Sequence, residues 1–553
     1  MESIQISIHI FQPIIRLYRH SQVPFPNPIQ KEIDYRICMD HSIFEENILS
    51  PIFYNLTENA NLPAFLIEGV EYSYRQFGER IYAIRQCIHL RSSSEVSSQK
   101  QIYAMAIHDD LDTYASIIAL WMEGCAYVPL HPNQPIERNL NIINQVGTDY
   151  IIDSSQQSVF DKELNNQRTE IIHTYEIKWC SDHFLNQWNS VGDEELAYIL
   201  FTSGSTGTPK GVCLTRKNIA TFIDSFWKTG ITIDTTDRCL QAFDLTFDVS
   251  IQSFLTGLIR GACVCTIPYG QVKYLHAASL IMEQGITFAA MAPSMLTYLR
   301  PYFDEIKADH LKTCILTAEA CPVDLIEDWY KCATNTEIYD FYGPTEGTIY
   351  CTYYKLNRNG NNLSANGIIS IGKPLDNVTA IIIDEKGNIL NTDEKGELCI
   401  AGDQITKGYW NNPEKNNTSF FEKEIKGSLV RFYHTGDLCN WDASGNIIYL
   451  RRIDQQAKIQ GFRVELSEIE YHTRTFFNNK NRAVAITYTN NRGLDEIALF
   501  IESEPIDSCE LTKYLQSKMP NYMIPSQLHF LSDFPLNNSD KIDRNKLKQL
   551  VCK

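Results

Sequence analysis

The sequence predicts an α/β protein: a large N-terminal domain of mixed sheets with packed helices, followed by a small, mobile C-terminal α+β domain. Short β-branched runs such as residues 197–201 alternate with helical patterns such as residues 113–123, which favours helices packed on mixed sheets. The length of 553 residues exceeds that of a single ordinary domain, which has roughly 100–200 residues. A charged stretch at residues 451–456 lies between two strand-like segments, 446–450 and 457–459, and enough chain follows it for a small separate domain.

The domain organisation follows from these patterns. Residues 1–45 carry no motif and are expected to be an N-terminal extension, whose first ten residues alternate apolar and polar side chains as a strand does. Residues 46–453 would form the large core domain and residues 454–553 the small mobile one, with a hinge at Asp454. After the hinge a helix is expected, with Ser467 as its N-cap and with Glu468 and Glu470 in its first turn.

Composition excludes several classes of protein. The net charge of −18 argues against non-specific binding to nucleic acid, which is itself a polyanion. The 16 cysteines are scattered without a C-x-x-C pair, as expected for free and mostly buried thiols in a reducing compartment. No uncharged apolar stretch approaches the ~20 residues of a membrane helix. We therefore expect a cytoplasmic protein that binds neither nucleic acid nor a membrane.

The most informative segment is the loop at residues 202–211, with the sequence TSGSTGTPKG, which follows an apolar strand. Its glycines let backbone N–H groups approach an anion closely, and its hydroxyls and lysine add further donors. A Walker A loop would need a glycine where Pro209 stands, so a P-loop kinase or GTPase is not expected. We predict that the phosphates of a ligand are bound by Thr202, Ser203, Gly204, Ser205, Thr206, Gly207 and Lys210.

This loop resembles the phosphate loop of the adenylate-forming superfamily, and further motifs of that superfamily follow in the expected order over roughly residues 50–550. The resemblance is strongest to the amino-acid adenylation domains of nonribosomal peptide synthetases. The segments that carry it are GCAYVPL at 124–130, FDVS at 247–250, FYGPTE at 341–346, GEL at 396–398, YHTGDL at 433–438, RIDQQAKI at 452–459, NYMIP at 521–525 and KIDR at 541–544.

The resemblance implies a two-step reaction that uses ATP and Mg²⁺. A carboxylate attacks the α-phosphate of ATP and releases pyrophosphate, and a pantetheine thiol then attacks the acyl-adenylate and releases AMP. Cations and oriented donors must stabilise the charge that builds on phosphorus. By their motif positions, Lys541, Thr345 and Glu346 would be catalytic: Lys541 would bridge the substrate carboxylate and the ribose, Thr345 would donate to the α-phosphate, and Glu346 would bind Mg²⁺.

Four further residues would hold the nucleoside, again by resemblance. Asp340 would lie beside the adenine amino group and Tyr342 against the adenine face. Asp437 would accept hydrogen bonds from both ribose hydroxyls, and Arg452 would add a ribose or phosphate contact.

Asp248 indicates the substrate class. In amino-acid-activating members this aspartate pairs with the α-ammonium of the substrate, because a buried cation needs a buried anion. With Lys541 it would clamp a zwitterion at both ends. The side-chain pocket would be modest in volume and mainly apolar, which favours a neutral, largely apolar amino acid; Asp248, Val249 and Gln252 together resemble pockets that accept proline. The pocket would be lined by Val249, Gln252, Ala290, Leu316, Ala318, Phe341, Ile349 and Tyr350.

The chain shows no carrier-protein segment after Arg544 and no condensation-domain motif upstream, so we expect a stand-alone enzyme that loads a separate carrier protein in trans. Thiolation would require the small domain to rotate at Asp454, which would move Lys541 out of the site and residues 460–463 in. Three alternatives remain open: an acyl- or aryl-CoA ligase of the same superfamily, a non-catalytic nucleotide-binding scaffold, and a D-alanine-type carrier ligase.

Overall fold

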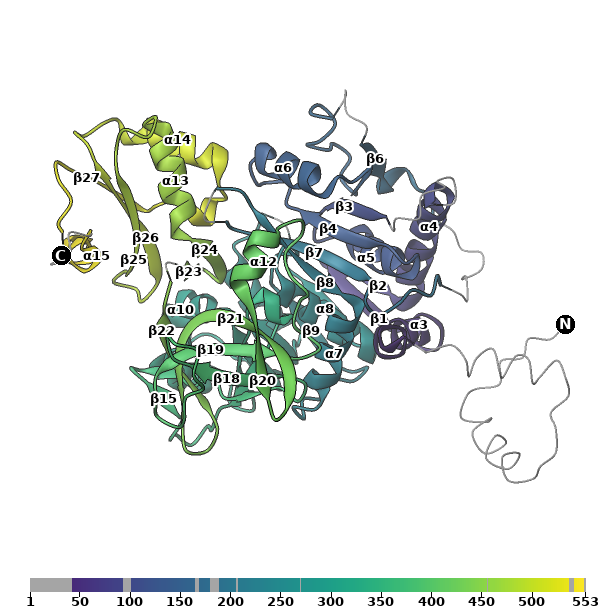
Figure 1. The fold of residues 1–553 in the computed structure, drawn as a ribbon. Helices are drawn as coiled ribbons and strands as arrows, with labels where there is room; N and C mark the ends of the chain where they lie inside the picture. Colours follow the sequence, from purple (N-terminus) through teal and green to yellow (C-terminus); the bar gives the residue numbers. More distant parts are fainter. Residues whose placement is uncertain are drawn as a thin grey trace, which may run out of the picture. The chain divides into compact units, whose positions relative to one another are not determined.

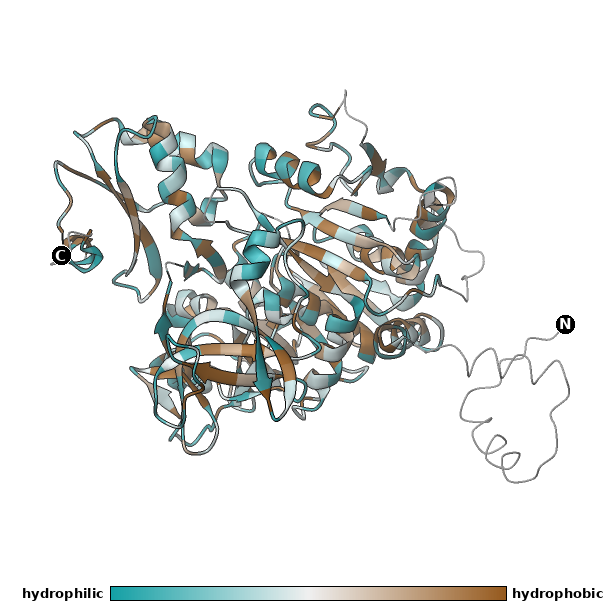
Figure 2. Cartoon of the chain, in the orientation of Figure 1, coloured by the Kyte–Doolittle hydropathy of each residue, from teal (hydrophilic) through white to brown (hydrophobic). Residues whose placement is uncertain are grey.

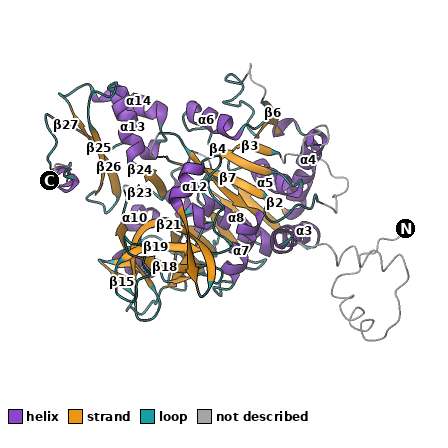
Figure 3. Cartoon of the chain, viewed as in Figure 1, coloured by secondary structure: helices purple, strands orange, loops and turns teal. Residues whose placement is uncertain are grey.

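The computed structural model describes residues 42–92, 101–164, 169–179, 188–204, 207–268, 270–454, 456–536 and 542–551. Nearly all of the predicted extension 1–45, including its expected strand, lies outside these residues, as do Ser205, Thr206 and Lys541. Figure 3 shows helices and strands alternating through most of the described chain. The helices are α3 (Ser50–Thr57), α4 (Tyr74–Ser92), α5 (Leu111–Met122), α6 (Ile136–Val146), α7 (Arg216–Trp227), α8 (Asp248–Arg260), α9 (Lys273–Glu283), α10 (Pro293–Leu299), α11 (Val323–Cys332), α12 (Pro413–Ser419), α13 (Leu466–Phe476), α14 (Ser508–Lys518) and α15 (Arg544–Val551).

The largest sheet has nine strands in the order β17-β14-β13-β12-β11-β9-β10-β1-β2. From β1 to β13 its neighbouring strands are parallel, and antiparallel strands close both edges. Successive residues such as Ile315 and Leu316 belong to different apolar cores, as expected when both faces of a parallel sheet are covered. Its strands are β1 (Pro63–Ile67), β2 (Val70–Ser73), β9 (Arg238–Gln241), β10 (Cys263–Thr266), β11 (Phe288–Met291), β12 (Thr313–Thr317), β13 (Glu337–Tyr342), β14 (Thr352–Lys355) and β17 (Lys373–Pro374).

A second sheet of six strands has the order β6-β5-β3-β4-β7-β8 and is parallel except for the pair β7–β8. Helix α5 is buried along almost its whole length, which is why its sequence is apolar on every side. No described helix combines the length and the hydropathy that crossing a bilayer requires. The strands are β3 (Ile102–Ala106), β4 (Ala126–Leu130), β5 (Tyr150–Asp153), β6 (Glu170–His173), β7 (Leu196–Thr202) and β8 (Lys210–Thr215).

A third, antiparallel sheet follows in the chain, and Figure 2 shows hydrophobic residues along its strands. Several of them form a small buried core of their own. It consists of β18 (Thr379–Ile383), β19 (Gly396–Ala401), β20 (Phe420–Ile425), β21 (Ser428–Trp441) and β22 (Ile447–Arg452). A short pair, β15 (Ser364–Ala365) and β16 (Ile368–Ile369), precedes it.

The C-terminal part begins with a hairpin of β23 (Gln456–Ile459) and β24 (Phe462–Glu465), which leads directly into α13. A three-stranded sheet of β25 (Ala483–Thr489), β26 (Asp495–Glu502) and β27 (Gln527–Leu531) then packs with α13, α14 and α15 (Figure 1). These elements form apolar cores of their own, and helices and strands combine here in the α+β arrangement that was expected for this region. The domain boundary at residue 454 stays a prediction.

Of two local expectations, for the N-cap of α13 and for the cysteines, the structure contradicts the first and confirms the second. Helix α13 begins at Leu466 with Glu465 as N-cap, so the prediction of Ser467 as N-cap is wrong. The reason is that β24 extends to Glu465 and leaves no loop residue for a serine cap. The expectation for the cysteines is confirmed for the described ones, which are free and mostly buried, with Cys263 and Cys265 inside β10.

Candidate functional site

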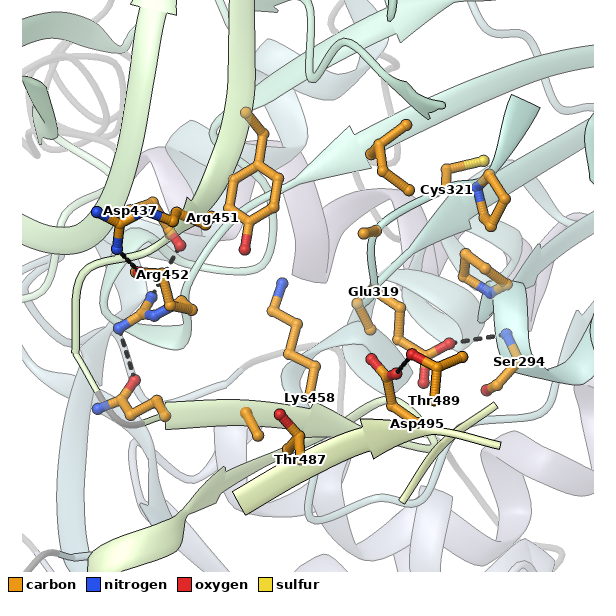
Figure 4. Close-up of a pocket in the computed structure, with 18 of the residues that line it drawn as sticks. Ser294, Glu319, Cys321, Asp437, Arg451, Arg452, Lys458, Thr487, Thr489 and Asp495 are labelled. Atoms are coloured by element: carbon orange, nitrogen blue, oxygen red, sulfur yellow. Dashed lines mark hydrogen bonds and ion pairs between the residues drawn. The ribbon is translucent and has the colours of Figure 1, made fainter. Parts of the chain in front are cut away.

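A cavity of about 630 Å³ opens at the carboxyl ends of β12 and β13, where ligands bind in open α/β sheets. The third sheet contributes Asp437 and Arg452 to its wall, and the C-terminal part contributes Lys458. Figure 4 shows the Lys458 side chain extending from β23 into the space between the Asp437–Arg452 side and Glu319. The cavity therefore lies where the large sheet, the third sheet and the C-terminal part meet.

All four residues predicted to hold the nucleoside line this cavity. The Tyr342 hydroxyl donates to Asp437 Oδ2 at 2.5 Å, and Arg452 donates to Asp437 Oδ1 at 3.0 Å. Asp340 is buried, and its Oδ1 has no hydrogen-bond partner among the described residues. Burial raises the pKa of Asp340, with the Lys458 ammonium opposing that shift. A buried polar atom without a partner at the cavity wall fits a nucleoside that would supply one.

Lys458 is a residue of this cavity that the sequence reasoning did not single out. Its ammonium lies 5.5 Å from the centroid of the Tyr342 ring, and burial lowers the pKa of the side chain, with the Asp437 carboxylate opposing that shift. The sequence could have identified Lys458, because it is the one cation in residues 455–459, the motif segment that follows the predicted hinge.

The phosphate loop connects β7 to β8, with Thr202 paired to Lys210 across the hairpin. A Cβ added at Gly204 would lie 2.0 Å from the carbonyl oxygen of Thr208, so this position requires glycine. The donors of the loop are engaged by carboxylates of the C-terminal part: the Gly204 N–H donates to Glu468 at 3.0 Å, and Lys210 donates to Glu465 at 3.3 Å. Two carboxylates thus occupy donors suited to phosphate oxygens.

Glu346 is fully buried, and both of its oxygens are engaged. The Tyr409 hydroxyl donates to Oε1 at 2.6 Å, and Arg463 donates to Oε2 at 2.6 Å. Burial alone would raise the pKa of Glu346, but Arg463 and Lys210 lower it to about 2. The carboxylate does not fit Mg²⁺ while Arg463 holds it, so no step through a metal follows from this geometry; the expectation that Glu346 binds Mg²⁺ stays a prediction.

Asp248 is the first residue of α8 and is buried. Among the described residues its Oδ2 has no hydrogen-bond partner. Burial raises the pKa of Asp248 to about 6, against contacts with the Thr345 side chain and with the backbone N–H groups of Val249 and Ile349. The structure thus places Thr345 beside Asp248, at the start of the short helix Thr345–Gly347.

Most of the residues predicted to surround the substrate side chain lie together, since Val249, Ala290, Phe341, Ile349 and Tyr350 belong to one apolar core. Leu316 belongs to the core on the other face of the sheet, so the expectation that it lines this pocket is wrong; side chains alternate between faces along a strand, and Ile315 is the one that faces this core. The Tyr350 hydroxyl donates to Gln252 at 3.2 Å, and the rings of Phe341 and Tyr350 have centroids 4.9 Å apart. Ala318 is partly exposed and lines the cavity. The others are buried: Val249, Gln252, Ala290, Leu316, Phe341, Ile349 and Tyr350.

The predicted hinge residue is paired across its own turn. Asp454 accepts from Arg452 Nε at 2.9 Å and from the N–H of Gln456 at 3.0 Å. Further along, the Gly461 N–H donates to Glu319, and a Cβ at Gly461 would lie 3.9 Å from that of Ala318. Residues around Gly461 therefore reach the cavity, whereas Lys541 lies outside the described residues.

Comparisons with known proteins agree with this geometry. Residues 53–410 match the model of the AMP-binding enzyme family. The chain is 32% identical over 441 residues to tyrocidine synthase 3 of Brevibacillus parabrevis, covering 78% of this chain and 6% of the relative. It is 30% identical over 461 residues to zwittermicin A synthase ZmaJ of Bacillus cereus, covering 81% of this chain and 85% of the relative. Several other peptide synthases that it matches are much longer, and the chain spans only 6% to 12% of their length.

Among solved structures, the chain resembles the adenylation domain AlmE of Vibrio cholerae, which was solved in complex with glycyl-adenosine-5'-phosphate. The TM-score is 0.79 at 23% identity, with 91% of this chain and 97% of AlmE covered. The mixed α/β fold expected from the sequence is therefore confirmed. Fold, cavity and relatives agree, and the chain belongs to the AMP-binding enzyme family of the adenylate-forming superfamily, with relatives among the adenylation domains of nonribosomal peptide synthetases.

Proposed function

We propose that this chain activates a small, neutral amino acid as aminoacyl-AMP and transfers it to the pantetheine thiol of a carrier protein. In the first step a substrate carboxylate oxygen bonds to the α-phosphorus of ATP, and the bond to the departing pyrophosphate breaks. In the second step the thiol sulfur bonds to the acyl carbon, the bond from that carbon to the AMP oxygen breaks, and AMP leaves while the thiol proton passes to solvent. The nucleoside would occupy the cavity lined by Asp340, Tyr342, Asp437 and Arg452.

The observation that carries the proposal is the buried Asp248 carboxyl, whose Oδ2 has no partner in the described part of the chain. An isolated buried carboxylate costs several kcal/mol unless it is paired. The α-ammonium of an amino acid would supply that pair and would hold the substrate beside Thr345. A fatty or aryl acid has no such group, so the acyl- or aryl-CoA ligase alternative leaves this carboxyl unexplained.

The side-chain pocket supports a small substrate. The Tyr350 hydroxyl donates to Gln252, and the Phe341 and Tyr350 rings pack against each other, so these buried side chains fill space among themselves. No charged side chain belongs to the predicted lining, so a charged substrate would lack a partner. We propose glycine or alanine as the substrate in preference to proline, because the proline ring needs space that these buried side chains fill.

The contacts of the C-terminal part support two arrangements of the enzyme. In the arrangement described above, Glu465 and Glu468 hold donors of the phosphate loop and Arg463 holds Glu346. ATP phosphates and these carboxylates compete for the same donors, so this arrangement suits the step after pyrophosphate has left. We propose that residues 456–551 turn away for adenylation, about the predicted hinge at Asp454, and that Lys541 then enters the site.

Amino-acid-dependent exchange between ATP and labelled pyrophosphate tests the proposal across the proteinogenic set, with aryl and fatty acids as comparison. We expect glycine or alanine to give the highest rate, with larger residues lower by tenfold or more; a methylene is worth only about 1–3 kcal/mol of discrimination. Exchange with aryl or fatty acids and none with amino acids would contradict the proposal. Transfer is then followed by mass spectrometry of a phosphopantetheinylated carrier protein supplied separately.

A further inference from the structure

Three metal-ligating side chains meet on the third sheet, outside the nucleotide cavity. Glu397 and Cys399 are two residues apart on β19, and His434 on β21 is the cross-strand partner of Cys399. Residues two apart on a strand share a face, and a cross-strand partner lies beside them. The pairing register shifts between Glu397 and Cys399, which brings Glu397 within reach of the same histidine.

The donor atoms are already close to the spacing of a tetrahedral metal site. His434 Nδ1 lies 2.9 Å from Glu397 Oε2 and 3.7 Å from Cys399 Sγ, and all three ligand atoms lie within 4.8 Å of one another. Zinc bond lengths of about 2.0–2.3 Å separate neighbouring ligands of a tetrahedron by about 3.3–3.6 Å. Each of the two separations from Nδ1 therefore differs from that of a zinc site by about half an ångström or less.

We propose that Glu397, Cys399 and His434 form a Zn²⁺ site, with a water molecule as fourth ligand. The donor set of sulfur, nitrogen and oxygen suits zinc rather than magnesium or calcium, which take oxygen ligands. Among the described residues this is the one group of three or more such side chains with ligand atoms this close. Glu397 and His434 are 23% and 32% exposed, so the open position faces solvent, while Cys399 is buried.

The surroundings of the three ligands hold them in place. Glu397 Oε1 accepts from the Gly436 N–H at 2.9 Å, which leaves Oε2 for the metal. The His434 ring packs against Phe421, with centroids 4.4 Å apart. Such supporting contacts orient ligands in metal sites. Binding releases the thiol proton of Cys399 to solvent as the zinc–sulfur bond forms. The Nδ1 proton that His434 donates to Glu397 is exchanged through solvent to Nε2, so that the neutral ring binds the metal through Nδ1. Since Gly436 precedes Asp437 within β21, the metal would also hold the part of this strand that presents Asp437 to the cavity.

Cobalt substitution tests the site in the full, tag-free and reduced chain. Co²⁺ is added stepwise, and thiolate-to-cobalt charge-transfer absorption is recorded before and after Zn²⁺ displaces the cobalt. We expect one Co²⁺ per chain with this absorption, and its loss in Cys399→Ser. His434→Arg should weaken Co²⁺ binding at least tenfold. The substitution replaces the ligand with a cation that can pair with Glu397, so this carboxylate keeps a partner when no metal is bound. Cys509→Ser alters an exposed cysteine elsewhere and should leave the absorption unchanged.

The outcomes separate the two interpretations of this cluster. Absence of the charge-transfer absorption from the wild-type chain would overturn the proposal and leave a hydrogen-bonded Glu–His–Cys group. So would an absorption that persists in Cys399→Ser, or Co²⁺ binding to His434→Arg that is as tight as binding to the wild-type chain. Circular dichroism of each variant verifies the fold, and His434→Arg decides the question if Cys399→Ser does not fold. Neither readout depends on adenylation activity.

Discussion

Replacing Glu465 by glutamine should shift the enzyme toward the arrangement that binds pyrophosphate. Glu465 Oε1 accepts from Lys210 at 3.3 Å and from Gln456 at 2.6 Å. The substitution keeps the size of the side chain and removes the charge that faces Lys210. A hydrogen bond to a charged group contributes about 1.5–3 kcal/mol. Lys210 and Glu465 are only 8% and 12% exposed, so solvent screens the loss little. Because the glutamine oxygen still accepts a neutral hydrogen bond, only part of the contribution is lost, and we take about 1.4 kcal/mol, which is a factor of ten in the equilibrium.

Two steady-state measurements follow from this shift. When the competent arrangement is a minor population, the apparent affinity for its ligand is reduced by that fraction. Glu465→Gln should therefore lower the KM for pyrophosphate in the exchange reaction by about tenfold and slow transfer to the carrier protein. Glu194→Gln is the matched control, because Glu194 forms an exposed ion pair with a lysine on the surface. Removing its charge should change neither the KM for pyrophosphate nor the transfer rate. Unchanged KM and transfer rate in Glu465→Gln would refute the reasoning that this carboxylate competes with pyrophosphate.

Three further predictions concern the substrate, its pocket and the hinge. Burial raises the pKa of Asp248 to about 6, and only its ionised form pairs with an ammonium, so the KM for the amino acid should rise as the pH falls below about 6, while the KM for ATP stays nearly constant. A profile without this rise would contradict the pairing. Tyr350→Ala removes the ring and the hydroxyl bonded to Gln252, so kcat/KM for leucine should rise by tenfold or more relative to alanine in exchange; an unchanged ratio would show that Tyr350 does not limit the pocket. Asp454→Pro fixes one backbone angle and removes the carboxylate that holds Arg452, so it should spare pyrophosphate exchange and slow carrier loading, and equal loss of both would count against the hinge.

Local sequence was sufficient for the elements that depend on nearby residues. The apolar run at residues 197–201 predicted β7, and the loop after β7 was identified by its glycines and hydroxyls. The order of motifs then identified the family and with it the four residues predicted to hold the nucleoside, all of which line the cavity. These predictions succeed because strand pattern and motif spacing are properties of short segments.

The contacts that the sequence did not predict join distant segments. The bond from Gly204 to Glu468 spans 264 residues, and that from Glu346 to Arg463 spans 117. Such pairs depend on how one folded part sits against another, which no local pattern encodes. The meeting of Cys399 and His434 was missed for a related reason: it depends on strand register, and a shift of one residue would turn one of them to the opposite face.

The ammonium pairing of Asp248 is tested most directly with two substrates that differ in one group. Alanine and propionate have the same carbon skeleton, and only alanine carries the α-ammonium. Pyrophosphate exchange by the wild-type chain should favour alanine by a hundredfold or more, since an unpaired buried charge costs about 3–5 kcal/mol. In Asp248→Asn the preference should fall close to one. Equal exchange with alanine and propionate in the wild-type chain would contradict the account.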